Sequence, residues 1–165
     1  MVRSMDQMLV VDYLIANEDR HLNNFGLLRI PDTLEWIGAA PIFDSGSCLG
    51  YDKRANLIIS GWGAECKPFK KTHEDQLKLV SSFDWIDFTK LEGIEEEIRE
   101  ILKDAGETID EERKRAIVLA VKKRIERLKQ MAEEESKSIK EAAFDKTEDD
   151  VAEDVARKYM ELGFQ

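Results

Sequence analysis

The stretches NEDRHLNN, residues 17–24, and APIFDSG, residues 40–46, organise this chain. Asp19 and Asn24 are five residues apart, too far for neighbouring turns of one helix but close enough for one tight loop to direct both inward. Asp44 follows an apolar run and precedes a small Ser-Gly pair. An Asp beside an acceptor hydroxyl, an Asn oxygen and a second Asp form the set that phosphoryl transfer from Mg-ATP requires.

The same stretches resemble the loops of known kinases. Residues 19–24, DRHLNN, are similar to the D-R-H-x-x-N loop of phosphatidylinositol 3/4-kinases. The wider frame, N-x-D-x-H-x-x-N-x-G followed by A-P-x-x-D, resembles the C-terminal half of HipA-like kinases, the toxin kinases of bacterial toxin–antitoxin pairs. The similarity is densest from Asp12 to Tyr51 and continues loosely through residues 67–69 and the later helices.

The resemblance implies transfer of the ATP γ-phosphoryl group to a serine or threonine hydroxyl of a protein, with ATP and Mg²⁺ as cofactors. By position in the motif, Asp19 is the catalytic base, while Asn24 and Asp44 bind the metal and the nucleotide phosphates through it. His21 supports the backbone and the metal-binding aspartate by hydrogen bonds. The D-F-G-like position reads DSG, which keeps the acid and the glycine but not the aromatic residue.

Each of these residues also has an ordinary structural interpretation. Asp19 is then a solvated loop carboxylate paired with Arg20, and Asn24 is a turn residue. For Arg20, placing a phosphate and bracing the loop or lying at the surface remain equal alternatives.

The sequence does not contain the other half of such a site. Only eighteen residues precede Asp19, and the nine glycines form neither G-x-G-x-x-G nor G-x-x-x-x-G-K. Kinases of this kind carry a Gly-rich loop and a phosphate-pairing Lys in an N-terminal lobe. We therefore expect a C-terminal lobe without its N-terminal lobe, inactive alone. The expected partners are a separately encoded N-terminal lobe or, by resemblance, a DNA-binding helix-turn-helix antitoxin.

Length and composition favour one soluble, cytoplasmic domain over residues 1–165. The chain is 42% hydrophobic and 36% charged, and no apolar run approaches a membrane span. Residues 1–71, the catalytic-loop region, carry 8 basic and 9 acidic side chains. Residues 72–165, the helical region, carry 17 and 26, which disfavours direct binding to nucleic acid. Cys48 and Cys66 are expected to be free thiols rather than zinc ligands.

The expected fold is mainly α with a small β-hairpin. A capping box at Ser4 opens a helix that runs to Ala16. Residues 25–30 and 35–38 flank a Pro-Asp-Thr turn and predict the hairpin, and residues 57–59 indicate a possible short strand.

The helical region begins with a helix capped by Thr72, with Leu77 and Val80 inward. A second helix then ends near Gly106, and a third is capped by Thr108 with Glu111. Residues 133–150 are polar and expected to fray in part, before a last helix capped by Thr147. The apolar stripes of the second and third helices comprise Leu91, Ile94, Ile98 and Ile101, and Ile117, Val121, Ile125, Leu128 and Met131.

Two other functions remain open at this point. The chain is alternatively a non-catalytic protein-interaction module derived from a kinase lobe, with residues 117–131 as part of its docking surface. A metal-dependent phosphohydrolase using Asp19, His21 and Asp44 ranks last, because such sites need a denser set of His and Asp ligands.

Overall fold

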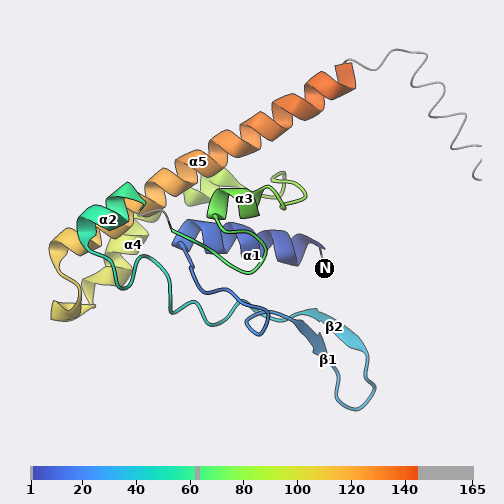
Figure 1. Cartoon of the computed structure of the whole chain (residues 1–165), viewed down its shortest axis with the longest axis horizontal. Helices are drawn as coiled ribbons and strands as arrows, with labels where there is room; N and C mark the ends of the chain where they lie inside the picture. The colour runs from blue at the N-terminus through green and yellow to red at the C-terminus, as the bar shows by residue number, and fades with distance from the viewer. Residues whose placement is uncertain (1, 62–63, 145–165) are drawn as a thin grey trace, which may run out of the picture. The chain divides into compact units, whose positions relative to one another are not determined.

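The computed structural model describes residues 2–61 and 64–144, and Figure 1 shows the arrangement of their helices and strands. This part of the chain is mainly helical with one two-stranded antiparallel hairpin, so the predicted mainly α fold with a small β-hairpin is confirmed. No helix in these residues is long and apolar enough to span a bilayer. The chain divides into two compact units, residues 1–129 and 130–165. The elements are α1 (Val2–Ile15), β1 (Leu27–Arg29), β2 (Trp36–Ala39), α2 (Ala55–Ser60), α3 (His73–Leu77), the 3₁₀ turn η1 (Phe88–Leu91), α4 (Ile94–Lys103), the 3₁₀ turn η2 (Gly106–Thr108) and α5 (Glu111–Phe144).

Helix α1 delivers the chain to the loop of residues 17–24. Its inner face buries Leu9 and Tyr13 at the spacing that the sequence predicted. The helix already includes Val2, so the prediction that Ser4 caps it is wrong: Ser4 lies within the helix. The helix ends because Ala16 takes a left-handed conformation, with φ of 51°.

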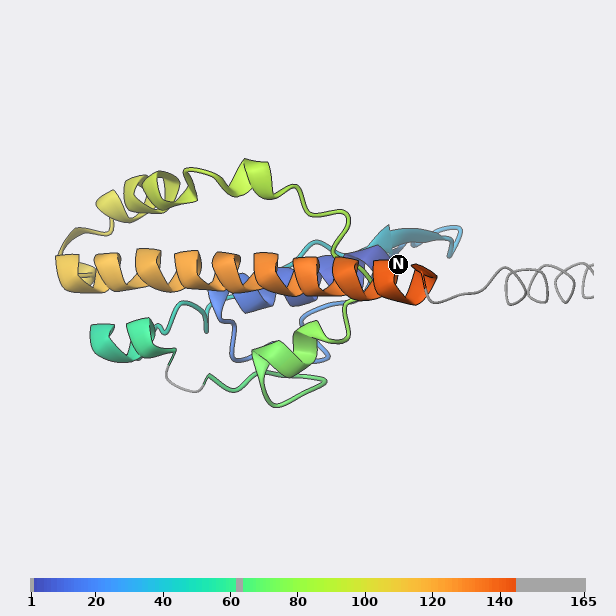
Figure 2. The same cartoon turned by 90° about the horizontal axis from the view of Figure 1, so that it is seen from above.

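The first part of α5 forms the centre of the core of residues 1–129. Ala116 and Ile117 are buried and pack against Ile58 of α2. Figure 2 shows η1 and α4 on one side of α5, and α2 and α3 on the other. Four of the five predicted stripe residues are thus internal and not available to a partner, whereas Met131 is half-buried. The buried members of the stripe are Ile117, Val121, Ile125 and Leu128.

The hairpin forms where the sequence predicted it. Leu27 pairs with Ala39 and Arg29 with Trp36, with an irregularity in the register between Leu28 and Arg29. Below the turn, the Ile30 N–H donates to the Glu35 carbonyl oxygen at 2.9 Å. Several apolar side chains of the hairpin remain exposed, Trp36 among them.

The predicted strand at residues 57–59 is wrong, because this segment forms the helix α2. Arg54 precedes the helix in an extended conformation, and Gly61 ends it with φ of 83°. The β-branched pair Ile58-Ile59 favours a strand by intrinsic propensity. Burial of Ile58 against α5 outweighs that preference.

The remaining helices follow the predictions in part. Thr72 caps α3 by accepting a hydrogen bond from the Asp75 N–H, as predicted, and Leu77 and Val80 are buried. In α4, Ile101 is 76% exposed, and Leu102 packs on the core instead.

The predicted cap of α5 is wrong, because Thr108 lies in η2. The Asp110 carboxylate accepts from the Arg113 N–H at 2.7 Å and caps the helix. Helix α5 continues to Phe144, past the point where fraying was expected. The last predicted helix, capped by Thr147, lies outside the described residues.

Candidate functional site

A buried ion pair supports the loop of residues 17–24 from below. The Asp12 carboxylate on α1 accepts from the Arg20 Nε and Nη2 atoms, both at 2.8 Å. Both side chains are 0% exposed. A fork-to-fork contact of this kind fixes the orientation of both partners as well as their distance. The loop is thereby held to the end of α1.

The same guanidinium also joins the loop to the segment that carries Asp44. Arg20 Nη1 donates to the Asn24 carbonyl oxygen at 3.1 Å and to the Phe43 carbonyl oxygen. Its Nη2 donates to the Ser45 hydroxyl at 3.3 Å. The Asp12 carboxylate accepts the remaining donors, so the five N–H groups of Arg20 all have acceptors. Arg20 therefore braces the loop, and the alternatives of a surface position and of pairing with Asp19 are wrong.

Asn17 adds a second connection between α1 and the loop. Its side-chain amide donates to Asp12 at 3.0 Å, and its oxygen accepts from the Asp19 N–H at 3.2 Å. Asn17 is completely buried. The position of the Asp19 backbone is therefore set by a side chain that is itself fixed to the core.

The structure brings Asn24 and Asp44 together from opposite ends of the hairpin. The Asn24 Nδ2 atom lies 2.5 Å from the Asp44 Oδ2 atom. Asn24 is buried and Asp44 is exposed. Asp44 has φ of 54°, a left-handed conformation that Asp adopts more readily than most residues. The two side chains meet at the mouth of the loop, as the sequence predicted.

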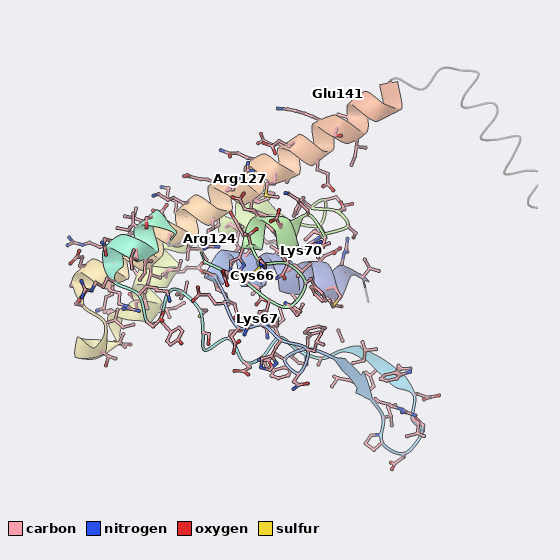
Figure 3. All side chains as sticks on the ribbon, in the orientation of Figure 1. Cys66, Lys67, Lys70, Arg124, Arg127 and Glu141 are labelled. Carbon is pink, nitrogen blue, oxygen red and sulfur yellow. The ribbon has the colours of Figure 1, made fainter. Side chains whose placement is uncertain are left out.

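Asp19 lies at the surface and pairs with Lys67 of the segment before α3 (Figure 3 labels Lys67). The Lys67 Nζ atom is 2.7 Å from the Asp19 Oδ1 atom, and the two side chains are 59% and 50% exposed. The hydrogen bond from Lys67 and its positive charge hold the pKa of Asp19 below its ordinary value. Asp19 is therefore an accessible, ionised carboxylate at neutral pH.

His21 is half-buried beside these groups. Its carbonyl oxygen accepts from the Asn24 N–H at 2.9 Å, which closes the turn of the loop. A positive charge on His21 also lowers the pKa of Asp19. The supporting hydrogen bonds predicted for the imidazole stay a prediction.

An apolar cavity of about 260 Å³ lies between α1 and the hairpin. Phe25 and Gly26, which follow Asn24 directly, form part of its wall, so the cavity begins beside the loop. The other lining residues are Ser4, Met5, Met8, Leu27, Ala39, Ala40, Pro41 and Ile42.

Sequence reasoning missed two residues of this site. Asp12 reads as one polar position in an amphipathic helix, and only its burial reveals its role. Lys67 is 48 residues from Asp19. The loose continuation of the kinase resemblance at residues 67–69 was a signal that could have indicated it.

The metal-binding potential of the site rests on Asn24 and Asp44. No group of three or more His, Cys, Asp or Glu side chains that could hold a metal occurs within residues 2–61 and 64–144. A Mg²⁺ ion in a phosphoryl-transfer site needs one or two protein oxygens, because phosphates and water supply the others. The donor set suits that kind of site and lacks the ligands of the phosphohydrolase alternative.

Comparison with known proteins relates part of the chain to a kinase. A 42-residue segment is 52% identical to the serine/threonine-protein kinase CtkA of Helicobacter pylori (strain J99 / ATCC 700824). The segment makes up 26% of this chain and spans only 13% of the length of CtkA. No protein-family model and no solved structure matches the chain. The chain is thus similar to a serine/threonine kinase over this short segment.

Proposed function

We propose that this chain provides the catalytic-loop half of a HipA-like kinase site that transfers the γ-phosphoryl group of Mg-ATP to a protein serine or threonine. The observation that carries the proposal is the meeting of Asn24 and Asp44 beside the accessible Asp19–Lys67 pair. The similarity to CtkA over 42 residues supports the kinase class.

Asn24 and Asp44 are the residues that would hold Mg²⁺. Both offer hard oxygen atoms, and a half-turn of the Asn24 amide places its Oδ1 where Nδ2 now meets Asp44. The metal, when bound, neutralises charge on the phosphates. Arg20 keeps the two ligands in register, because it bonds to the backbone on both sides of the site.

Asp19 would orient the acceptor hydroxyl by accepting its hydrogen bond. A lowered pKa makes this carboxylate a weak base, which suits a loose transition state where the hydroxyl proton leaves late. Lys67, already beside Asp19, would face the negative charge of the transferred group. This pair therefore combines an acceptor for the hydroxyl with a cation for the phosphoryl group.

The apolar cavity beside Phe25 supports a nucleotide as the ligand, since ligand pockets combine apolar walls with a few polar groups. The sequence contains no Gly-rich phosphate loop. The proposal assigns that loop and its lysine to a separate polypeptide or to a further segment of the same protein. A helix-turn-helix antitoxin is the further partner that the HipA-like resemblance suggests.

Calorimetric titration of Mg-ATP tests this proposal. We expect weak binding that needs Mg²⁺ and is lost in the Asp44→Asn variant. Asp52→Asn is the matched control, because Asp52 is an exposed carboxylate paired with Lys53 outside the site. Binding without Mg²⁺, or equal binding by the wild type and Asp44→Asn, would contradict the proposal.

A further inference from the structure

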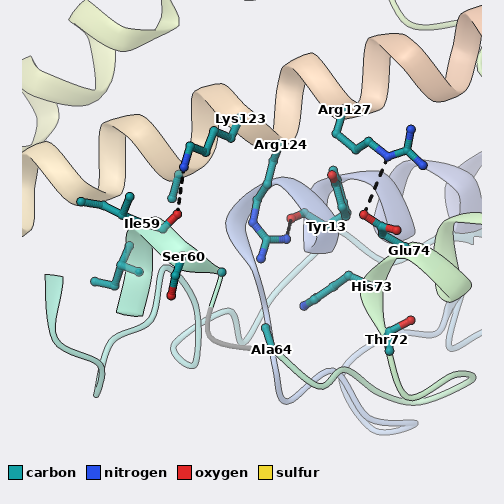
Figure 4. Close-up of a pocket in the computed structure, with 13 residues that line it drawn as sticks. Tyr13, Ile59, Ser60, Ala64, Thr72, His73, Glu74, Lys123, Arg124 and Arg127 are labelled. Carbon is teal, nitrogen blue, oxygen red and sulfur yellow. Dashed lines mark hydrogen bonds and ion pairs between the residues drawn. The ribbon is translucent and has the colours of Figure 1, made fainter. Parts of the chain in front are cut away.

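A second cavity, of about 490 Å³, lies among α1, α2, α3 and the first part of α5 (Figure 4). None of Asp19, Asn24, Asp44 and Lys67 lines it. Its apolar wall is formed by Ile58, Ile59, Ala64 and Ala120. Its polar lining comprises Tyr13, Ser60, Thr72, His73, Glu74, Lys123, Arg124 and Arg127, and Gly61 completes it. The cavity is large enough for a small organic ligand.

The polar lining of the cavity is mainly basic. Helix α5 contributes Lys123, Arg124 and Arg127, and Glu74 is the one carboxylate among the lining residues. The Arg127–Glu74 contact is long, with 3.8 Å between the Nε and Oε1 atoms. Basic side chains therefore outnumber acidic ones in the described lining of the cavity. An anionic group would suit such a lining.

Arg124 lies at the centre of the cavity. Its Nη1 atom donates to the Tyr13 carbonyl oxygen at 2.7 Å, and its guanidinium stacks over the Tyr13 ring at 5.2 Å. Figure 4 shows the side chain reaching from α5 toward Ser60 and His73. Burial lowers the pKa of Arg124 from its usual value, although an arginine remains charged. The charge is therefore held in place and only partly solvated.

His73 presents an unsatisfied nitrogen to the same space. Its side chain is buried, with 5% exposure, and its Nε2 atom has no hydrogen-bond partner within residues 2–61 and 64–144. In Figure 4 the ring points into the cavity, below Arg124. A buried polar atom without a partner destabilises the folded protein. Such an atom in a basic cavity indicates that a ligand oxygen completes its bonding.

We propose that this cavity is a second ligand site, which binds a small phosphate monoester with its phosphate oxygens between the Arg124 guanidinium and His73 Nε2. Lys123 and Arg127 balance the remaining charge, and the apolar wall holds the organic part. The Ser60 and Thr72 hydroxyls also line the cavity, but they donate to the Leu57 carbonyl oxygen and to the Asp75 carboxylate. The site is separate from the proposed kinase centre and does not depend on it.

The two histidines of the chain, His21 and His73, allow a direct test. Phenyl phosphate would be titrated into protein labelled with ¹⁵N-histidine, and the imidazole signals followed by NMR. We expect saturable shifts of the His73 signals, with the His21 signals unchanged. Inorganic phosphate should shift the same signals more weakly, because it lacks the organic part. Benzoate, with one charge, should bind about tenfold or more weakly than phenyl phosphate.

Two variants complete the test. The exposed Lys123 and the half-buried Arg127 can be changed together to Gln with little effect on folding, and this variant should bind phenyl phosphate about tenfold or more weakly. His73→Gln should also weaken binding. Lys122→Gln is the matched control, because Lys122 pairs with Glu95 of α4 outside the cavity.

Three results would overturn the proposal. They are shifts at His21 alone, equal affinity for benzoate and phenyl phosphate, and unchanged binding in the Lys123/Arg127 double variant.

Discussion

The charged side chains on the buried side of the loop of residues 17–24 differ from those on its solvent side. On the buried side, Asp12 and Arg20 are completely buried, and all the donors of Arg20 are satisfied. On the solvent side, Asp44 is exposed, and the Asp19 side chain is 50% exposed. The Asp19 carboxylate pairs with the exposed Lys67, and the Asp19 N–H donates to the Asn17 side chain. One pair of charged residues around this loop is thus shielded from solvent, whereas the other two carboxylates are in contact with it.

This difference in burial separates side chains that stabilise the loop from side chains that are accessible to a ligand. A buried pair contributes orientation, and it is costly to break because the remaining charge has no solvent. An exposed carboxylate contributes little to stability and stays available to a metal ion or a hydroxyl. Asp12 and Arg20 therefore stabilise the loop, and we propose that Asp19 and Asp44 carry the function.

Arg20→Met removes the buried Asp12–Arg20 ion pair and should have the largest effect on stability. The variant leaves Asp12 as an uncompensated buried carboxylate, so we expect a loss of about 3–5 kcal/mol in the free energy of unfolding. Urea denaturation followed by circular dichroism measures this loss. Arg54→Met is the control, because Arg54 is exposed and forms no side-chain cap, and it should change stability by less than about 0.5 kcal/mol. Equal effects of the two substitutions would remove the distinction.

His73 is buried like Arg20, but its Nε2 atom has no hydrogen-bond partner in the part of the chain that the structure describes. Burial and the nearby Arg124 lower its pKa to about 4, with Asp12 acting in the opposite direction. Tyr13, Glu74, Lys123 and Arg127 are the other titratable or charged groups in the described lining of its cavity. In the unfolded chain, histidine binds a proton near pH 6.5. Between pH 6.5 and 4 the unfolded state therefore binds more protons, and stability falls as the pH falls.

The size of this effect can be measured by difference. In phosphate-free buffer, wild-type protein should lose about 2 kcal/mol more than His73→Gln when the pH is lowered from 7 to 5. Urea denaturation at both pH values provides the four free energies. The same loss in both proteins would show that His73 is not held neutral by its surroundings.

Lys67→Met removes the exposed Asp19–Lys67 ion pair and should have the smallest effect on stability. Because Lys67 holds the pKa of Asp19 down, the substitution should raise that pKa toward the ordinary value for Asp. The carboxyl carbon signal of Asp19 in a pH titration by NMR reports the change. Lys78→Met, which breaks the exposed pair with Asp75, is the control and should leave the Asp19 titration unchanged. An unchanged pKa of Asp19 in Lys67→Met would mean that the pair does not persist in solution.

The features that the sequence predicted well are set by local signals. The hairpin follows from two short apolar runs around Pro31, and the start of α3 from the Thr72 cap. The meeting of Asn24 with Asp44 follows from the hairpin itself, which returns the chain to the loop.

The features that it did not predict depend on burial between distant segments. The strand expected at Ile58 is a helix because α5 covers it. The sequence did not decide whether Arg20 places a phosphate, braces the loop or lies at the surface. Its partner Asp12 lies on the preceding helix, and only the packing shows that both side chains are buried. The Lys67–Asp19 contact joins segments whose proximity no local pattern encodes.

The proposal that Asn24 and Asp44 hold Mg²⁺ is tested most directly by locating where a divalent metal binds. Mn²⁺, a paramagnetic substitute for Mg²⁺, would be titrated into the protein with ATP, and the loss of NMR signals recorded by residue. We predict that the NMR signals of the Asn24 side-chain amide and of the backbone of residues 43–46 broaden first, that Mg²⁺ reverses the broadening, and that Asp44→Asn abolishes it. Broadening first at the exposed acidic start of α4, around Glu95–Glu97, with no effect of Asp44→Asn, would contradict the proposal.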